Sequence, residues 1–189
     1  GNPSCNGFAA EMVTIHGKAA HAAVCPWEGV NAVSIATSAM NMIGLMRETF
    51  KDEDHVRVHS LVRKGGDVLN SVPDLVLMEE KVRAKTLEGI RDAKAKLDRA
   101  FDAAAFAFGG TIERENLQGY MPVLYRPADS VLIEAAKQLG ASYRVVKETD
   151  FNNASTDVGD LTHLMPVVNF TFNGFEGKLH GADFRITDP

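Results

Sequence analysis

Residues 55–66 read HVRVHSLVRKGG, and this stretch decides the fold class. Valine or serine occupies every second position, while arginine, histidine or leucine occupies the positions between them. A two-residue period is typical of a strand with one face buried and the other exposed. The Gly65-Gly66 pair ends the pattern, because glycine interrupts regular structure. The stretch therefore predicts a half-exposed strand followed by a turn.

Further strands and helices flank this strand on both sides. Strand patterns cover 8–16 (FAAEMVTIH), 75–85 (LVLMEEKVRAK) and 111–115, and apolar residues recur at helical spacing over 30–50 and 87–108. The resulting order is strand, helix, strand, strand, helix, strand, which fits the split βαβ arrangement. We therefore predict an α+β, ferredoxin-like fold, with a four-stranded antiparallel sheet and two helices on one of its faces.

The rest of the chain predicts a second, smaller unit. Residues 116–128 contain two prolines and a glycine, and we interpret them as the connection out of the first unit. A helix pattern follows, then strand patterns over 143–147 and 166–172. A unit of about 60 residues buries little surface alone, so we interpret it as part of a larger α/β domain. The expected domain boundaries are 8–118 and 119–189.

Composition and charge disfavour several classes of function. The chain carries 20 Lys and Arg against 25 Asp and Glu, which gives a formal net charge of −5. This balance disfavours a nucleic-acid partner. The apolar runs are far shorter than the ~20 residues that cross a bilayer, so we expect no membrane partner. Two cysteines, Cys5 and Cys25, without CxxC spacing favour a reducing compartment, and we expect a cytoplasmic protein.

Two histidines stand out in a sequence that has no GxxxxGK[ST], GxGxxG, GxSxG or HExxH pattern. His21 lies in GKAAHAA, between a strand and a loop. Its imidazole could donate a hydrogen bond to an oxyanion or could cap the loop. His180 lies in GKLHGADF, just after a strand pattern, where a metal ligand or a surface histidine would fit.

Four other polar residues have ordinary explanations. Asn70, in GGDVLNSVPD, belongs to a turn, where asparagine commonly bonds its own backbone. Arg83, in KVRAK, is either a solvated cation on a strand or a fork for a carboxylate. Glu79 and Glu80 are neighbours on a strand and point to opposite faces, so we predict a solvated pair that cannot share a metal ion.

Five segments, taken in order, carry a resemblance to a known family: GKAAHAAVCPWEGVNA (17–32), GGDVLNSVPD (65–74), KVRAK (81–85), STDVGD (155–160) and LHGADF (179–184). Together they resemble the metallopeptidase family that contains aminoacylases, carboxypeptidase G and amidohydrolases. The resemblance is closest to the branch of aminobenzoyl-glutamate hydrolase and β-alanyl-lysine dipeptidases. It implies a metal-binding α/β domain interrupted by a ferredoxin-like lid that also dimerises. The chain would supply the lid and the part of the catalytic domain that follows it.

The resemblance also implies roles for the candidate residues. His180 matches the last metal ligand, with zinc as the first expectation and manganese or cobalt as alternatives. His21 matches the lid histidine that reaches the partner subunit's site and stabilises the oxyanion formed when metal-activated water attacks the amide. Asn70 and Arg83 match lid positions that hold the carboxylate end of the substrate. Gly181 stands where relatives more often carry serine.

The resemblance implies a fragment of a metal-dependent amidohydrolase or dipeptidase. Its substrates would be N-acyl amino acids or dipeptide-like molecules, and it would act as a homodimer through the lid. The remaining metal ligands and the general base would precede residue 1, so we expect the isolated chain to be inactive and to hold metal weakly. The alternative is a non-catalytic ferredoxin-like module for dimerisation or small-molecule binding. RNA binding would need exposed aromatic residues, and the strands offer few.

Overall fold

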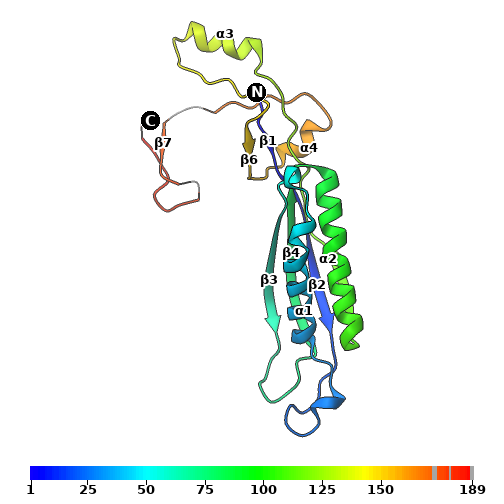
Figure 1. Ribbon diagram of the computed structural model, residues 1–189. Coiled ribbons are helices and arrows are strands. Elements are labelled where there is room, and N and C mark those ends of the chain that lie inside the picture. Colours follow the sequence, from blue (N-terminus) through cyan, green and yellow to red (C-terminus); the bar gives the residue numbers. More distant parts are fainter. Residues whose placement is uncertain (172–173, 179, 188–189) are drawn as a thin grey trace.

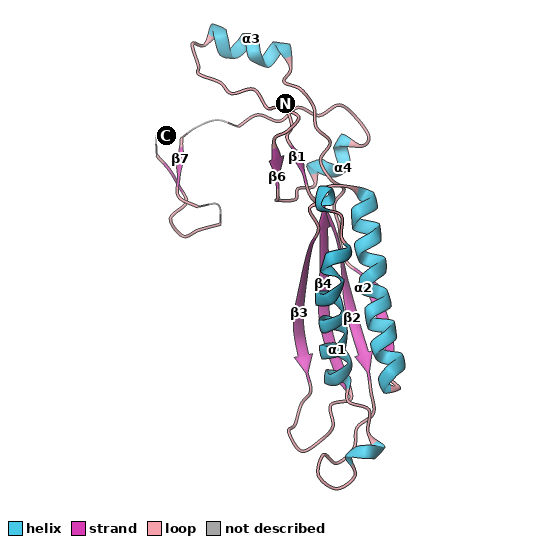
Figure 2. Ribbon diagram, in the orientation of Figure 1, coloured by secondary structure: helices cyan, strands magenta, loops and turns pink. Residues whose placement is uncertain are grey.

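The main body of the computed structural model is a four-stranded antiparallel sheet in the order β3-β4-β2-β5 (Figure 1). The structure describes residues 1–171, 174–178 and 180–187. The strands are β2 (Gly7–His16), β3 (Arg57–Gly65), β4 (Leu75–Ala84) and β5 (Thr111–Asn116). Helices α1 (Ala32–Leu45) and α2 (Leu87–Phe108) cover one face of the sheet (Figure 2). The α+β class and the split βαβ order are confirmed.

The core forms where the alternating pattern of the strands meets the apolar stripes of the helices. Every second residue of β4 is buried, from Val76 to Ala84, and the residues between them are half-buried on the open face. From β2, Val13 and Ile15 enter the same layer, where they meet Leu97 and Phe101 of α2. Each fully buried large apolar side chain contributes roughly 1.5–3 kcal/mol to folding. This layer therefore holds the helices on the sheet.

Polar caps define the ends of the two helices. The Asn31 side chain accepts hydrogen bonds from two backbone N–H groups of α1, and the Thr86 hydroxyl accepts one from Gly89 N at 2.9 Å in α2. Gly109 ends α2 in the left-handed conformation, with φ of 80°. The α1 helix ends earlier than the predicted 30–50, and a 3₁₀ turn, η2 (Met46–Thr49), follows it. There the Thr49 hydroxyl donates to the Met46 carbonyl at 2.7 Å, which favours the tighter turn.

The chain after residue 117 is less regular than its sequence pattern predicts. It contains α3 (Ser130–Gln138), α4 (Val158–Thr162) and the two-residue strands β6 (Phe151–Asn152), β7 (Phe175–Glu176) and β8 (Arg185–Ile186). The strands predicted over 143–147 and 166–172 are wrong for the described residues, which are irregular there; Phe172 lies outside them. A strand needs a hydrogen-bonded neighbour, and within the described chain these segments pair with none.

The first residues of the chain lie against this later part. Strand β1 (Ser4–Cys5) pairs in parallel with β6. The buried Asn2 side chain donates to Val167 O at 2.6 Å and accepts from Asn169 N at 2.7 Å. These bonds connect the start of the chain to a segment more than 160 residues away. Among the described helices, none is both long and apolar enough to cross a membrane.

Candidate functional site

Two loops meet at one end of the sheet, at the bottom of Figure 1, and we call them the tip. Residues 17–31 follow β2, and residues 66–74 precede β4. The backbone of one loop bonds the other: Val72 N donates to Ala20 O at 2.9 Å, and Ala22 N donates to Asn70 O at 3.0 Å. These bonds set His21 opposite Ser71 in a short antiparallel bridge. His21 and Asn70, two residues predicted from the sequence, thereby lie one residue apart across this bridge.

A close backbone approach explains the glycine at the start of the tip. Lys18 and Val30 exchange two backbone hydrogen bonds of 2.9 Å, so the loop folds back onto itself. A Cβ atom on Gly17 would lie 2.1 Å from the Val30 carbonyl oxygen. Any other residue would force the two segments apart. The glycine of GKAAHAA therefore serves the geometry that positions His21.

The loop backbone sets the tautomer of His21. The Nδ1 atom accepts hydrogen bonds from Ala23 N and Val24 N, each at 3.2 Å. A nitrogen that accepts from N–H groups carries no proton, so in the neutral imidazole the proton is on Nε2. The side chain is exposed. His21 therefore presents an N–H donor to whatever faces the tip, which is the chemistry an oxyanion requires.

The Asn70 side chain is available to a ligand. Its backbone carbonyl belongs to the bridge between the loops, but its exposed amide makes no hydrogen bond to any described residue. The expectation that this asparagine bonds its own backbone is therefore not met. Large apolar side chains of the same two loops are also exposed: Trp27 is 78% exposed and Leu69 101%. Exposed apolar groups of this size gathered at one place mark an interaction surface.

Arg83 lies at the other end of the sheet from the tip. It pairs in register with Phe8 and lies eight residues along β4 from Leu75, the strand end that adjoins the tip, which corresponds to roughly 25 Å. Its Nη1 donates to Ser155 Oγ at 2.7 Å, and its guanidinium lies 5.5 Å from the centre of the Phe8 ring. Arg83 therefore contacts the STDVGD segment, another part of the sequence resemblance, and does not meet His21 within one chain.

His180 also lies apart from the tip. It is exposed, in a turn with φ of 61°, and its imidazole has no hydrogen-bond partner among the described residues. Leu179, which begins the LHGADF segment, lies outside the described residues. In that described part of the chain, no group of three or more His, Cys, Asp or Glu side chains is placed to hold a metal ion. Among the described residues, His180 therefore has no further metal-ligating side chains grouped around it.

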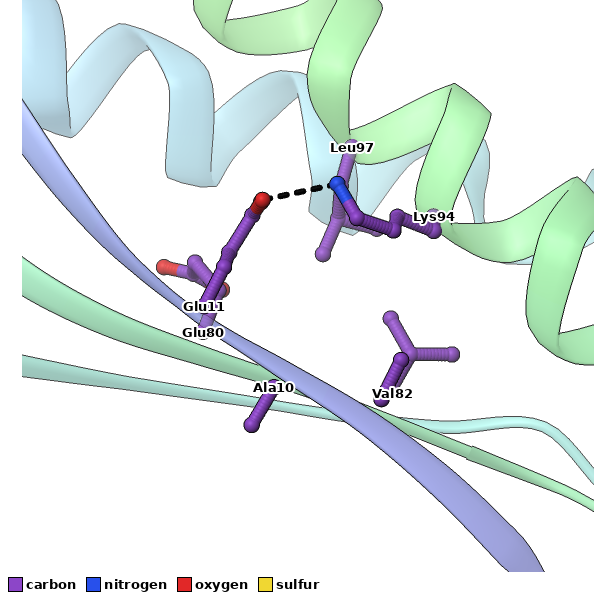
Figure 3. Close-up of a pocket in the computed structure, with 7 residues that line it drawn as sticks. Ala10, Glu11, Glu80, Val82, Lys94 and Leu97 are labelled. Carbon is purple, nitrogen blue, oxygen red and sulfur yellow. Dashed lines mark hydrogen bonds and ion pairs between the residues drawn. The ribbon is translucent and has the colours of Figure 1, made fainter. Parts of the chain in front are cut away.

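A buried acidic pair at the helix–sheet interface is a feature that the sequence analysis missed (Figure 3). Glu80 is 1% exposed and Glu11 2%. The two are direct cross-strand neighbours on the face that the helices cover. Glu80 accepts from Ser60 Oγ at 2.7 Å, and Glu11 pairs with Lys94 Nζ at 2.7 Å. The prediction of a solvated Glu79–Glu80 pair is therefore wrong for Glu80.

Burial changes the acidity of this pair. It raises the pKa of Glu80 to about 7; the Ser60 hydrogen bond opposes the rise and the Glu11 charge adds to it. Burial also raises the pKa of Glu11, against the opposing effect of Lys94. The sequence does contain a signal for the burial of Glu80. Every second residue around it, Val76, Met78 and Val82, is apolar, so Glu80 lies on the strand face that is predicted to be buried. Glu79, on the other face, pairs with Arg63 at 2.6 Å as a surface residue does.

Comparisons with known proteins agree with this architecture. Residues 5–107, more than half of the chain, match the family model described as peptidase dimerisation domain. The Xaa-Arg dipeptidase of Mus musculus is 31% identical over 161 residues, which cover 83% of this chain and 37% of that protein. The Homo sapiens Xaa-Arg dipeptidase is 30% identical over 167 residues, covering 85% and 37%.

A solved structure of aminopeptidase PepT from Bacillus cereus shares the fold, with a TM-score of 0.71 at 24% identity over 97% of this chain and 48% of that one. The aminobenzoyl-glutamate utilization protein from Klebsiella pneumoniae has a TM-score of 0.61 at 18% identity over 87% and 43%. The chain thus spans less than half the length of these relatives and structures. The family match over residues 5–107 confirms the resemblance carried by the sequence motifs, and the chain belongs to the peptidase dimerisation domain family.

Proposed function

We propose that this chain is part of a peptidase or amidohydrolase that cleaves dipeptide-like or N-acyl amino acid substrates with a water activated by a bound divalent metal ion. The observation that carries the proposal is the outward Nε2–H donor of His21, whose orientation is set by two backbone N–H groups. The dipeptidase names of the relatives support the class of reaction. The isolated chain would be inactive, and its proposed domains are 8–118 and 119–189.

His21 would act on the carbonyl oxygen of the scissile amide. As water adds to the carbonyl carbon, negative charge develops on that oxygen, and a donor fixed before the reaction stabilises it without reorganisation. The neutral tautomer suits this role, because Nε2 already holds the proton. Asn70, whose backbone carbonyl accepts from Ala22 N directly after His21, would offer its exposed amide to the substrate.

The distance along the sheet favours a site shared between two subunits. Arg83 is roughly 25 Å from the tip, so one chain does not bring its guanidinium and His21 to one small substrate. We propose a homodimer in which the tip of one subunit enters the cleft of the other. There Arg83 would hold the substrate carboxylate through its fork of N–H donors. His180 would supply one metal ligand, and the further ligands, to zinc, manganese or cobalt, would come from outside the described residues.

The test uses the full-length protein with His21→Ala. We expect kcat to fall by about 10²- to 10³-fold with a smaller change in KM, because the lost donor acts on the transition state. Lys18→Ala is the matched control, since its side chain is exposed on the same loop. Size-exclusion chromatography checks that the variant still dimerises. Unchanged turnover in His21→Ala would instead favour a non-catalytic dimerisation module.

A mixing experiment tests the sharing between subunits. His21→Ala and His180→Ala, each strongly impaired alone, are mixed in equal amounts and allowed to exchange subunits. If His21 serves the partner's site, each mixed dimer has one intact site, and about a quarter of the wild-type activity returns. Absence of recovery, with subunit exchange demonstrated by a mass label, would contradict a site shared in this way.

A further inference from the structure

A groove of about 250 Å³ lies at the start of the edge strand β3, beside the end of α1. Eight residues line it: Arg47 of η2, Asp52 of the 3₁₀ turn η3 (Asp52–Asp54), and Phe50, Lys51, His55, Val56, Arg57 and Val58. The lining side chains that are charged at pH 7 are three cations, Arg47, Lys51 and Arg57, and one carboxylate, Asp52. A chain with a net charge of −5 therefore presents a positively charged hollow at this place.

The cations of the groove have no carboxylate partners, unlike many other basic side chains of the main body. Arg47, Lys51 and Arg57 form no ion pair with any described residue, and the Arg57 guanidinium donates to the adjacent Val56 carbonyl at 3.0 Å. By contrast, Arg63 pairs with Glu79 and Lys94 with Glu11. Asp52, the one acid lining the groove, forms no ion pair with a described residue either. The groove lining therefore keeps a surplus of two positive charges, three cations against one carboxylate, and none of the cations is in an ion pair with a described residue.

Like charges also face one another across the strands next to the groove. Arg57 lies directly opposite Arg83, and His59 lies opposite Lys81, on the open face of the sheet. Such pairs destabilise a sheet unless an anion offsets them. The pKa of His59 is lowered by burial and by the charges of Arg83, Lys81, Arg47 and Arg57, so the positive potential extends from the groove across this face.

We propose that this groove binds a small molecule that carries a phosphate or several carboxylates. Arginine guanidinium groups hold such oxyanions through two parallel N–H bonds, and Lys51 would add a compact charge. The ring of Phe50 and the half-buried Val58 give the groove an apolar wall for the remainder of the ligand. The volume suits a small metabolite and not a drug-sized molecule. This goes beyond the proposed hydrolysis, and binding in the groove requires neither His21 nor a metal ion.

The test titrates the 189-residue chain with inorganic phosphate, pyrophosphate and citrate at low ionic strength, followed by amide NMR shifts. We expect saturable shifts confined to residues 47–58 and their neighbours, with a Kd of about 1 mM or tighter for the best probe. Stronger binding of pyrophosphate than of citrate would indicate that the ligand of the groove is a phosphate ester. Stronger binding of citrate would indicate a polycarboxylate.

Matched variants separate a built groove from general attraction. Arg47→Gln with Lys51→Gln should weaken binding at least tenfold, because two charges at the ligand are lost. Arg91→Gln with Arg99→Gln removes the same charge from the exposed side of α2 and should change the Kd by less than about twofold. All four side chains are exposed, so both variants should fold, which circular dichroism checks. Equal weakening in both variants, or shifts that do not saturate, would overturn the proposal. Neither result depends on hydrolysis, so the proposed function is not decided by them.

Discussion

The tip and the helix–sheet interface use polar side chains in opposite ways. At the tip, His21 and Asn70 are exposed, and backbone hydrogen bonds fix the loops that carry them. At the interface, Glu11 and Glu80 are buried, and side chains of β3 and α2 supply their partners. The exposed polar groups of the tip are accessible to a ligand, whereas the buried carboxyl groups of the interface can contact only other parts of the protein.

This difference separates where mutations should affect activity from where they should affect stability. Burial makes the interface sensitive to each lost atom, because its packing cannot close a cavity completely. The tip holds its conformation through backbone bonds and close approaches such as that at Gly17, so its exposed side chains contribute little to folding. Paired substitutions of one residue type in buried and exposed positions can test the contrast directly.

The largest effect on stability is expected from Phe101→Ala. Phe101 is 0% exposed between α2 and the sheet, and its loss should lower the free energy of unfolding by about 3–5 kcal/mol. Phe106→Ala, on the same helix but at a side chain that is 90% exposed, is the control and should cost less than about 1 kcal/mol. Urea unfolding followed by circular dichroism measures both. Similar losses in the two variants would mean that another molecule covers Phe106.

A smaller effect is expected from pH, through Glu80. Its pKa rises from 4.5 to about 7 on folding, so the folded state binds the proton more tightly than the unfolded state. The contribution of Glu80 to the free energy of unfolding is therefore greatest below about pH 4.5. It is lost as the pH rises through about 7, and the loss is at most about 3 kcal/mol. Urea unfolding at several pH values between about 5 and 8 measures the slope.

The neighbouring glutamates give a matched pair of variants for this slope. Glu80→Gln should remove most of the fall in stability, leaving a smaller one from Glu11, whose pKa is also raised by burial. Glu79→Gln changes the adjacent residue and should leave the slope unchanged, because Glu79 lies on the open face of the sheet, in an ion pair with Arg63. A slope that persists unaltered in Glu80→Gln would show that another group titrates.

The order of helices and strands could be predicted from the sequence because each element has its own period and its own ends. The bounds of α2 agree with the predicted 87–108, since Thr86 caps its first turn and Gly109 ends it. The strands predicted over 143–147 and 166–172 failed because β-propensity does not provide a partner strand. Strand formation there depends on neighbours that no local pattern reveals.

The candidate site could be predicted only in part. Periodicity cannot place His21 beside Asn70, because the bridge joins loops about fifty residues apart in the chain; the ordered motifs pointed to both residues. Nor does any motif reveal that Ala23 N and Val24 N set the tautomer of His21, which depends on the loop conformation. The burial of Glu80 was missed because charged residues are usually solvated, although the alternation around it was apolar.

The smallest effect on stability is expected at the tip itself. Leu69 is 101% exposed, so Leu69→Ser should change the free energy of unfolding by less than about 0.5 kcal/mol. Leu97, on the buried side of α2, is the comparison, and Leu97→Ser should lower the free energy of unfolding several times more. Urea unfolding at two protein concentrations gives a second comparison, because only a surface covered by another subunit gains stability as the concentration rises. If Leu69→Ser destabilises the protein only at the higher concentration, the Leu69 side chain is buried in the dimer and exposed only in the single chain. A large loss at both concentrations would contradict the division of roles between the tip and the interface.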